Sequence, residues 1–75
     1  MSDGAIIVTG GSGEIGSAIC ARSAADGYDV INLDLAPPSA GFAGRWVRVD
    51  LADVAMTQEV LRREVAAAPV LRLVH

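Results

Sequence analysis

The sequence predicts an α/β fold, a doubly wound parallel sheet of which these 75 residues form the first half. Apolar runs of strand length alternate with segments of helix length, in the order strand, helix, strand, loop, strand, helix, strand. The hydrophobic fraction of 52% suits strands that are covered on both faces. Because crossovers between parallel strands are right-handed, we expect the strands in the spatial order 3-2-1-4.

The first half of the chain is expected to contain a strand, a helix and a second strand. Residues 5–8 form an apolar, β-branched run. A helix is predicted over residues 14–26, followed by Gly27 in the left-handed conformation that ends helices. The second strand is expected over residues 28–34, and Cys20 in the helix is expected to be a buried structural thiol. The helix residues expected to face the sheet are Ile15, Ala18, Ile19, Arg22 and Ala25.

The second half is expected to contain a loop, two strands and a helix. The loop covers residues 35–44, which are rich in proline and glycine. Strands are predicted over residues 45–50 and 70–74, and Trp46 is expected to cover the sheet edge. The helix is predicted over residues 54–68. Asp53 is its expected N-cap, and Pro69 is expected to end it. The residues of this helix expected to face the sheet are Val54, Thr57, Leu61, Val65 and Ala68. Its expected solvated face comprises Gln58, Glu59, Arg62, Arg63 and Glu64.

Length and composition limit the domain organisation and the partners. Seventy-five residues are about half of an ordinary domain, and so apolar a sheet needs more chain to cover it. We therefore expect residues 1–75 to be the N-terminal part of a single, larger domain. Its own chain or a companion chain would supply the rest. The net charge of −3 and the absence of lysine argue against nucleic acid and anionic membranes as partners.

The N-terminus and the single cysteine also argue against several classes of protein. The start Met1-Ser2-Asp3-Gly4 lacks the basic region of a signal peptide, and the apolar run behind it is too short to cross a bilayer. One cysteine cannot form an internal disulfide, and the sequence has no Cys/His cluster that would indicate a metal site. These features predict a cytoplasmic protein.

Four glycines lie between the first strand and the end of the first helical turn, at Gly10, Gly11, Gly13 and Gly16. Glycine costs conformational entropy on folding, so this concentration calls for a reason. The free N–H groups of a helix start bind anions, and the absence of side chains leaves room for a diphosphate. Gly11, Gly13 and Gly16 match the G-x-G-x-x-G spacing of dinucleotide-binding turns. The alternative is a tight turn without a ligand.

Asp34 follows the glycine turn at the interval expected for an acid that binds an adenosine ribose. It lies eighteen residues beyond Gly16 (34 minus 16), at the end of the second predicted strand. A local turn bond is the alternative role. Its carboxylate would repel the 2′-phosphate of NADP, and Leu35-Ala36-Pro37 offers no cation. The sequence therefore predicts NAD rather than NADP.

Asp50 and Leu51 close the third predicted strand at the same edge of the sheet. A carboxylate there can accept a hydrogen bond from an exocyclic amine, and a leucine can form an apolar wall for a flat ring. We expect these residues to contact adenine. The alternative is that Asp50 only orders the turn before Asp53.

These elements together resemble the opening of the short-chain dehydrogenase/reductase superfamily, a Rossmann-type NAD(P)-binding domain. The similarity rests on Thr9-Gly10-Gly11-Ser12-Gly13-Glu14-Ile15-Gly16, Asp34, Asp50-Leu51 and Leu73-Val74-His75. The resemblance implies a diphosphate surrounded by Gly10, Ser12, Gly13, Glu14, Ile15 and Gly16. It places the adenosine ribose at Asp34, beside Leu35, and adenine at Asp50 and Leu51.

The glycine spacing distinguishes two branches of this superfamily. Single-domain members usually have T-G-x-x-x-G-x-G, and here Glu14 replaces the penultimate glycine. The pattern T-G-x-x-G-x-x-G, met by Gly10, Gly13 and Gly16, is more typical of the extended branch of epimerases and dehydratases. Glu14 is expected to face solvent, where its charge is favourable at a helix N-terminus.

The resemblance implies an NAD-dependent oxidoreductase that transfers hydride between NAD and an alcohol or carbonyl substrate, with a homo-oligomer as the expected assembly. The superfamily's Tyr-x-x-x-Lys pair, with its Ser and Asn, has no counterpart here: Tyr28 begins a strand, lysine is absent, and His75 has no readable partner. The alternatives are a nucleotide-sugar epimerase or dehydratase of the extended branch, and a non-catalytic dinucleotide-binding module.

Overall fold

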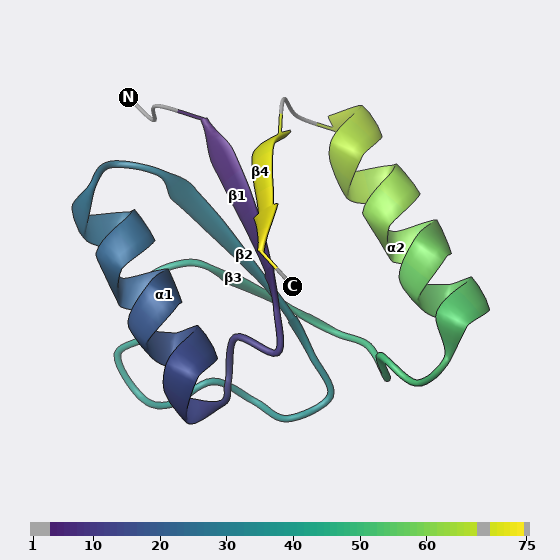
Figure 1. Cartoon of the computed structure of the whole chain (residues 1–75), viewed down its shortest axis with the longest axis horizontal. Coiled ribbons are helices and arrows are strands. Elements are labelled where there is room, and N and C mark those ends of the chain that lie inside the picture. The colour runs from purple at the N-terminus through teal and green to yellow at the C-terminus, as the bar shows by residue number, and fades with distance from the viewer. Residues whose placement is uncertain (1–3, 68–69, 75) are drawn as a thin grey trace.

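The computed structural model describes residues 4–67 and 70–74. Within them lie β1 (Ala5–Thr9), α1 (Glu14–Ala25), β2 (Asp29–Asp34), β3 (Arg45–Arg48), α2 (Val54–Ala67) and β4 (Val70–Val74). The strands form one parallel sheet in the order β3-β2-β1-β4, which confirms the predicted topology. The two helices lie on opposite sides of the sheet (Figure 1). The fold is thus the first half of a doubly wound sheet.

The core has two layers because successive side chains of β1 point to opposite faces of the sheet. Ala5 and Ile7 belong to the layer under α2. Ile6 and Val8 belong to the layer under α1. The other buried members of the α2 layer are Ile31, Leu33, Val49 and Val60, and those of the α1 layer are Cys20 and Val30. All four apolar residues of β1 are buried, as expected for a central strand of a parallel sheet.

The face of α1 that packs on the sheet differs from the predicted one. Of the five expected inward residues, Ile19 packs against the core, whereas Ala18, Arg22 and Ala25 are exposed and Ile15 is 79% exposed. The buried residue is Cys20, with Ala24 packed beside it. The cause lies at Gly16, which packs against the backbone of the preceding bend. Residues four positions apart share a helix face, so Cys20 follows Gly16 onto the sheet.

The inward face of α2 is also rotated from the prediction. Val54 is 63% exposed and Val65 is 57% exposed, whereas Val60 is buried. Leu61 packs against the same core layer, as predicted. Glu64 was expected in solvent, but its side chain is largely buried and forms an ion pair with Arg45 of β3. The helix ends at Ala67, and the predicted roles of Ala68 and Pro69 lie outside the described residues.

The ends of several elements follow the predicted local chemistry. Gly27 has a φ of 94°, the left-handed conformation expected after α1. Asp53 caps α2, since its Oδ1 accepts a hydrogen bond from the Met56 N–H at 3.0 Å. Trp46 lies on the edge strand β3 and donates its Nε1–H to the Asp34 carbonyl at 2.9 Å. The strand β3 ends at Arg48, two residues earlier than predicted. In the described part of the chain, neither helix has the length and apolar character needed to cross a membrane.

Candidate functional site

The bend between β1 and α1 lies at the carboxyl end of the sheet, directly beside the end of β2. Gly10 has a φ of 70°, a left-handed conformation that favours glycine. Its N–H donates to the Leu33 carbonyl at 2.8 Å, which ties the bend to β2. The chain therefore turns sharply after β1 and enters α1 next to the residue at which β2 ends.

The glycines of this bend and of the first turn of α1 have different surroundings. A Cβ on Gly16 would lie 2.8 Å from the Gly11 Cα and 2.9 Å from the Gly10 carbonyl carbon. A Cβ on Gly11 would lie 2.7 Å from Asn32 Cγ. A Cβ on Gly13 would meet only the Gly10 oxygen, at 3.5 Å. Close packing thus explains why Gly11 and Gly16 are glycines. A tight turn without a ligand would require the same two glycines. Close packing does not explain Gly13, where the space is open.

The start of α1 presents unpaired backbone donors. The first intrahelical bond runs from the Ser17 N–H to the Gly13 carbonyl at 2.8 Å. Gly13 is the N-cap and provides no side-chain cap. The amides of Glu14, Ile15 and Gly16 consequently have no acceptor among the described residues. Three free N–H groups at the positive end of a helix form an anion-binding arrangement.

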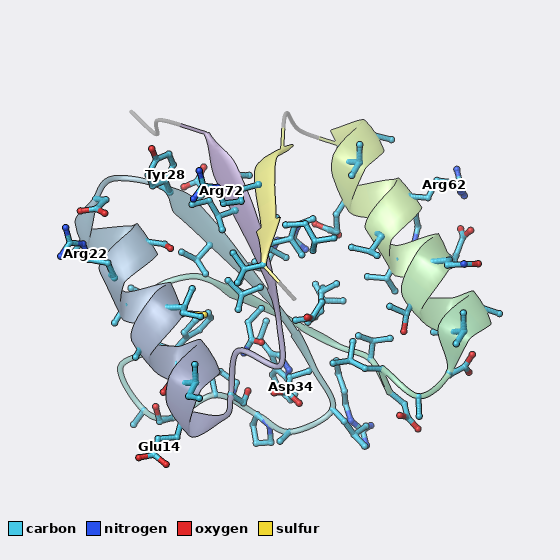
Figure 2. All side chains as sticks on the ribbon, in the orientation of Figure 1. Glu14, Arg22, Tyr28, Asp34, Arg62 and Arg72 are labelled. Atoms are coloured by element: carbon cyan, nitrogen blue, oxygen red, sulfur yellow. The ribbon has the colours of Figure 1, made fainter. Side chains whose placement is uncertain are left out.

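Asp34 points toward this bend. Its Oδ2 accepts a hydrogen bond from the Ser12 N–H at 3.0 Å, and its Oδ1 accepts one from the Ala36 N–H at 3.2 Å. Figure 2 shows Asp34 and Glu14 at one end of the molecule and Tyr28 at the other. The structure therefore brings the predicted acid and the predicted anion site together. The Ala36 contact shows that the local turn bond considered for Asp34 is also present.

Ser12 has internal partners for its backbone N–H and for its hydroxyl. Its N–H is taken by Asp34, and its hydroxyl donates to the Ala36 carbonyl at 2.7 Å. The same hydroxyl accepts a hydrogen bond from Asn32 Nδ2 at 3.0 Å. Ser12 was expected beside a diphosphate, and here it links the bend to the end of β2. Asn32 was not singled out in the sequence, although a polar residue inside an apolar strand was a visible signal.

Asp50 and Leu51 also lie at the carboxyl end of the sheet, but their contacts are local. Asp50 Oδ1 accepts a hydrogen bond from the Ala52 N–H at 3.0 Å, and its carbonyl accepts one from the Asp53 N–H at 2.9 Å. Leu51 is half-buried and packs against the core layer under α2. These bonds match the alternative in which Asp50 orders the turn before α2. Contact of Asp50 and Leu51 with adenine stays a prediction.

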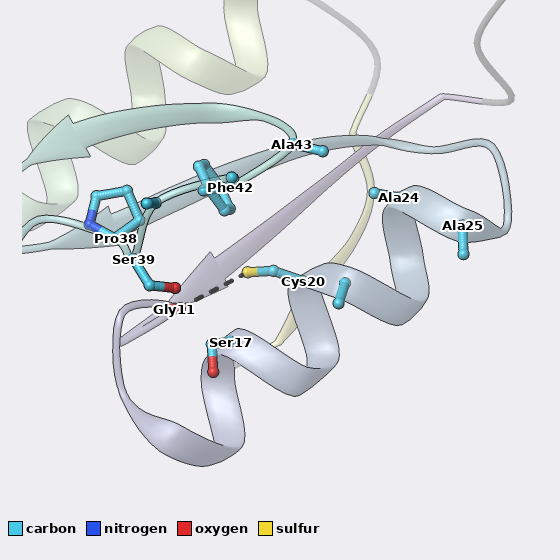
Figure 3. A pocket seen from close by; sticks show the side chains of 12 residues that line it. Gly11, Ser17, Cys20, Ala24, Ala25, Pro38, Ser39, Phe42 and Ala43 are labelled. Carbon is cyan, nitrogen blue, oxygen red and sulfur yellow. Dashed lines mark hydrogen bonds between the residues drawn. The ribbon is translucent and has the colours of Figure 1, made fainter.

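A cavity of about 450 Å³ lies between α1 and residues 38–43 (Figure 3). Pro38 and Phe42 line it from the loop, and Ala24 lines it from α1. Cys20 also lines it, and its Sγ lies 3.9 Å from the Gly11 carbonyl oxygen. Burial raises the pKa of the Cys20 thiol, so this group stays protonated at neutral pH. The buried position of Cys20 agrees with the predicted structural role.

Comparison with known proteins identifies the family. The model of the NAD dependent epimerase/dehydratase family matches residues 6–73, and the chain belongs to this family. The chain is also similar to the crystal structure of a short chain dehydrogenase from Leptospira borgpetersenii serovar Hardjo-bovis (strain JB197) with bound NAD+. The TM-score is 0.75 and the identity 28%, over 89% of this chain and 28% of the dehydrogenase. No curated protein matches significantly. The predicted resemblance to short-chain dehydrogenases is confirmed.

Proposed function

We propose that these residues bind the adenosine diphosphate half of NAD in an oxidoreductase of the short-chain dehydrogenase/reductase type. One observation carries the proposal. The Asp34 carboxylate is hydrogen-bonded to the Ser12 N–H, so an acceptor for ribose hydroxyls adjoins the free amides at the start of α1. The family match and the NAD+ bound to the similar dehydrogenase support this assignment.

The residues present fit the cofactor in a definite arrangement. The diphosphate would lie before α1 at Glu14, Ile15 and Gly16, where the amides are free, and the open space at Gly13 would admit it. Gly10 would shape the turn, and Ser12 would hold it against β2. The ribose would lie at Asp34 and Leu35. Adenine would lie at Asp50 and Leu51.

The bound NAD would accept or donate a hydride, and these residues would position its adenosine half. The substrate would be an alcohol or carbonyl compound, and we assign no catalytic group to these 75 residues. Tyr28 is not a candidate, because it lies at the amino end of the sheet, opposite to Asp34 (Figure 2). The remaining part of the domain would also cover the exposed apolar side chains of α2.

Electrostatics favours NAD over NADP at this site. A 2′-phosphate carries roughly −1.5 to −2 charges at neutral pH. At about 4 Å from a carboxylate, each unit of charge would cost ~1 kcal/mol in water and ~4 kcal/mol at an effective dielectric constant of about 20. Leu35, Ala36 and Pro37 provide no cation to offset this repulsion.

The test replaces Asp34 in the full-length protein and measures the dissociation constants of NAD and NADP by calorimetry. Asp34→Ala and Asp34→Ser are expected to weaken NAD binding and to reduce the preference for NAD by about tenfold or more, because the repulsion of the 2′-phosphate is removed. Asp29→Ala is the matched control, since Asp29 is an exposed acid at the other end of β2. An unchanged preference in the Asp34 variants would refute the assignment.

The second candidate is a nucleotide-sugar epimerase or dehydratase of the extended branch. It is favoured by the family that the chain belongs to and by the spacing of Gly10, Gly13 and Gly16. Net formation of NADH from an alcohol substrate would support the first candidate. Conversion of a nucleotide sugar with NAD returned to its oxidised form would support the second.

A further inference from the structure

Asn32 is a polar residue in an otherwise apolar part of the sheet. It is fully buried, with 0% of its surface exposed, between Ile31 and Leu33 of β2. Its Oδ1 has no hydrogen-bond partner among the described residues. Burying an unpaired amide oxygen costs stability, so an apolar residue would suit the core better. The buried amide of Asn32 therefore points to a role other than stability.

The hydrogen bond that Asn32 makes leads to the candidate site. Asn32 Nδ2 donates to Ser12 Oγ at 3.0 Å, and Ser12 Oγ donates to the Ala36 carbonyl at 2.7 Å. The Ser12 and Ala36 N–H groups both donate to the Asp34 carboxylate, at 3.0 and 3.2 Å. We call these four residues, Asn32, Ser12, Asp34 and Ala36, the Ser12 clamp. They join the glycine bend to the turn after β2.

The Ser12 clamp is anchored in the sheet by Asn32 of β2. Asn32 lies directly beneath the bend, because Gly11 has no side chain: a Cβ there would lie 2.7 Å from Asn32 Cγ. The amide of Asn32 can thus reach Ser12 from inside the sheet, whereas Ser12 and Ala36 lie nearer the surface. An anchor in a strand holds a group more accurately than one in a loop.

We propose that Asn32 is a positioning residue that sets the preference for NAD over NADP. This inference rests on the proposed function. Through Ser12 and Ala36, Asn32 holds both oxygens of the Asp34 carboxylate in one orientation. A fixed carboxylate accepts from the ribose hydroxyls without reorganisation, and it cannot turn away from a 2′-phosphate. Removing the hydrogen bond between Asn32 and Ser12 loosens the turn that holds Asp34. This weakens NAD binding and relieves the repulsion of NADP.

Asn32→Leu in the full-length protein separates this role from a structural one. Leucine has a similar size and removes both the donor and the unpaired Oδ1, so the melting temperature is expected to stay unchanged or to rise. Calorimetry with NAD and NADP is expected to show a preference for NAD reduced by about fivefold, the effect of one hydrogen bond. Ser12→Ala, which breaks the clamp from the other side, is expected to reduce the preference similarly.

Val30→Ala is the matched control, because Val30 is buried on the same face of β2 and has no bond to the clamp. It is expected to lower the melting temperature and to leave the preference for NAD unchanged. The proposal is overturned if Asn32→Leu and Ser12→Ala keep the wild-type preference while Asp34→Ala abolishes it; the proposed function then stands. If the wild-type protein binds neither cofactor, or Asp34→Ala changes nothing, the proposed function itself fails.

Discussion

At the scale of single residues, the glycine bend combines two physical requirements. Gly11 and Gly16 allow the backbone to approach Asn32 and the bend itself at distances that no Cβ permits. Gly13 instead leaves open space in front of the free amides of α1. The sequence alone does not separate these roles, because it does not show which atoms surround each glycine. The surroundings of each position in the structure separate them.

Gly16→Ala is expected to destabilise the full-length protein by about 1–3 kcal/mol, because the new methyl group would meet backbone atoms of Gly10 and Gly11 that cannot move aside. Thermal or denaturant unfolding measures this loss. Gly13→Ala is the comparison, since Gly13 has a φ of −76° and its nearest neighbour would be 3.5 Å away. That variant is expected to lose no more than about 1 kcal/mol. Equal losses at the two positions would contradict this division of roles.

At the scale of elements, the two helices begin in opposite ways. The start of α2 is capped, since Asp53 Oδ1 accepts the Met56 N–H. The start of α1 has no side-chain cap, and its first amides are free. A capped helix start has fewer donors to offer a ligand, and an uncapped one keeps them. The difference supports an anion site at α1 rather than at α2.

Asp53→Ala is expected to lower the free energy of unfolding by about 1 kcal/mol, because the Met56 N–H loses its acceptor. Denaturant unfolding of the full-length protein checks this value. Asp53→Asn keeps an oxygen at the cap and is expected to lose a few tenths of a kcal/mol at most. If Asn and Ala were equally destabilising, the carboxylate charge rather than the cap would be responsible.

At the scale of the whole molecule, α1 and α2 are held to the sheet by different means. α1 packs through Gly16 against the bend and through Cys20 and Ala24 against the core. α2 is attached through Val60 and Leu61, and through the ion pair between Glu64 and Arg45. Its other large apolar side chains, Val54, Met56 and Val65, are exposed. The attachment of α2 therefore depends strongly on Val60, its one buried residue.

Val60→Ala is expected to destabilise the full-length protein by about 2 kcal/mol, since it removes buried methyl groups and leaves a cavity under α2. Hydrogen exchange is expected to accelerate in α2 more than in α1. Val65→Ala provides the control, because Val65 is 57% exposed and its truncation is expected to change stability by less than about 0.5 kcal/mol. Similar losses for the two variants would show that α2 is attached by a different face.

The sequence by itself determined the order of the strands and helices, the parallel topology, the glycine bend and the cap at Asp53. These features depend on short-range patterns: apolar runs, turn residues and residues a few positions apart. They also place Asp34 at the same edge as the bend, because the carboxyl ends of parallel strands meet there.

Only the tertiary structure decided which face of each helix is buried and how the bend is held. Ile15 and Cys20 are both apolar, and the contact of Gly16 with the bend selects Cys20 for the core. Asn32 and Ser12 are 20 residues apart, and Arg45 and Glu64 are 19 apart. Such pairs meet because separate elements are packed against one another. Local sequence patterns contain no information on that packing, so these contacts could not be predicted from them.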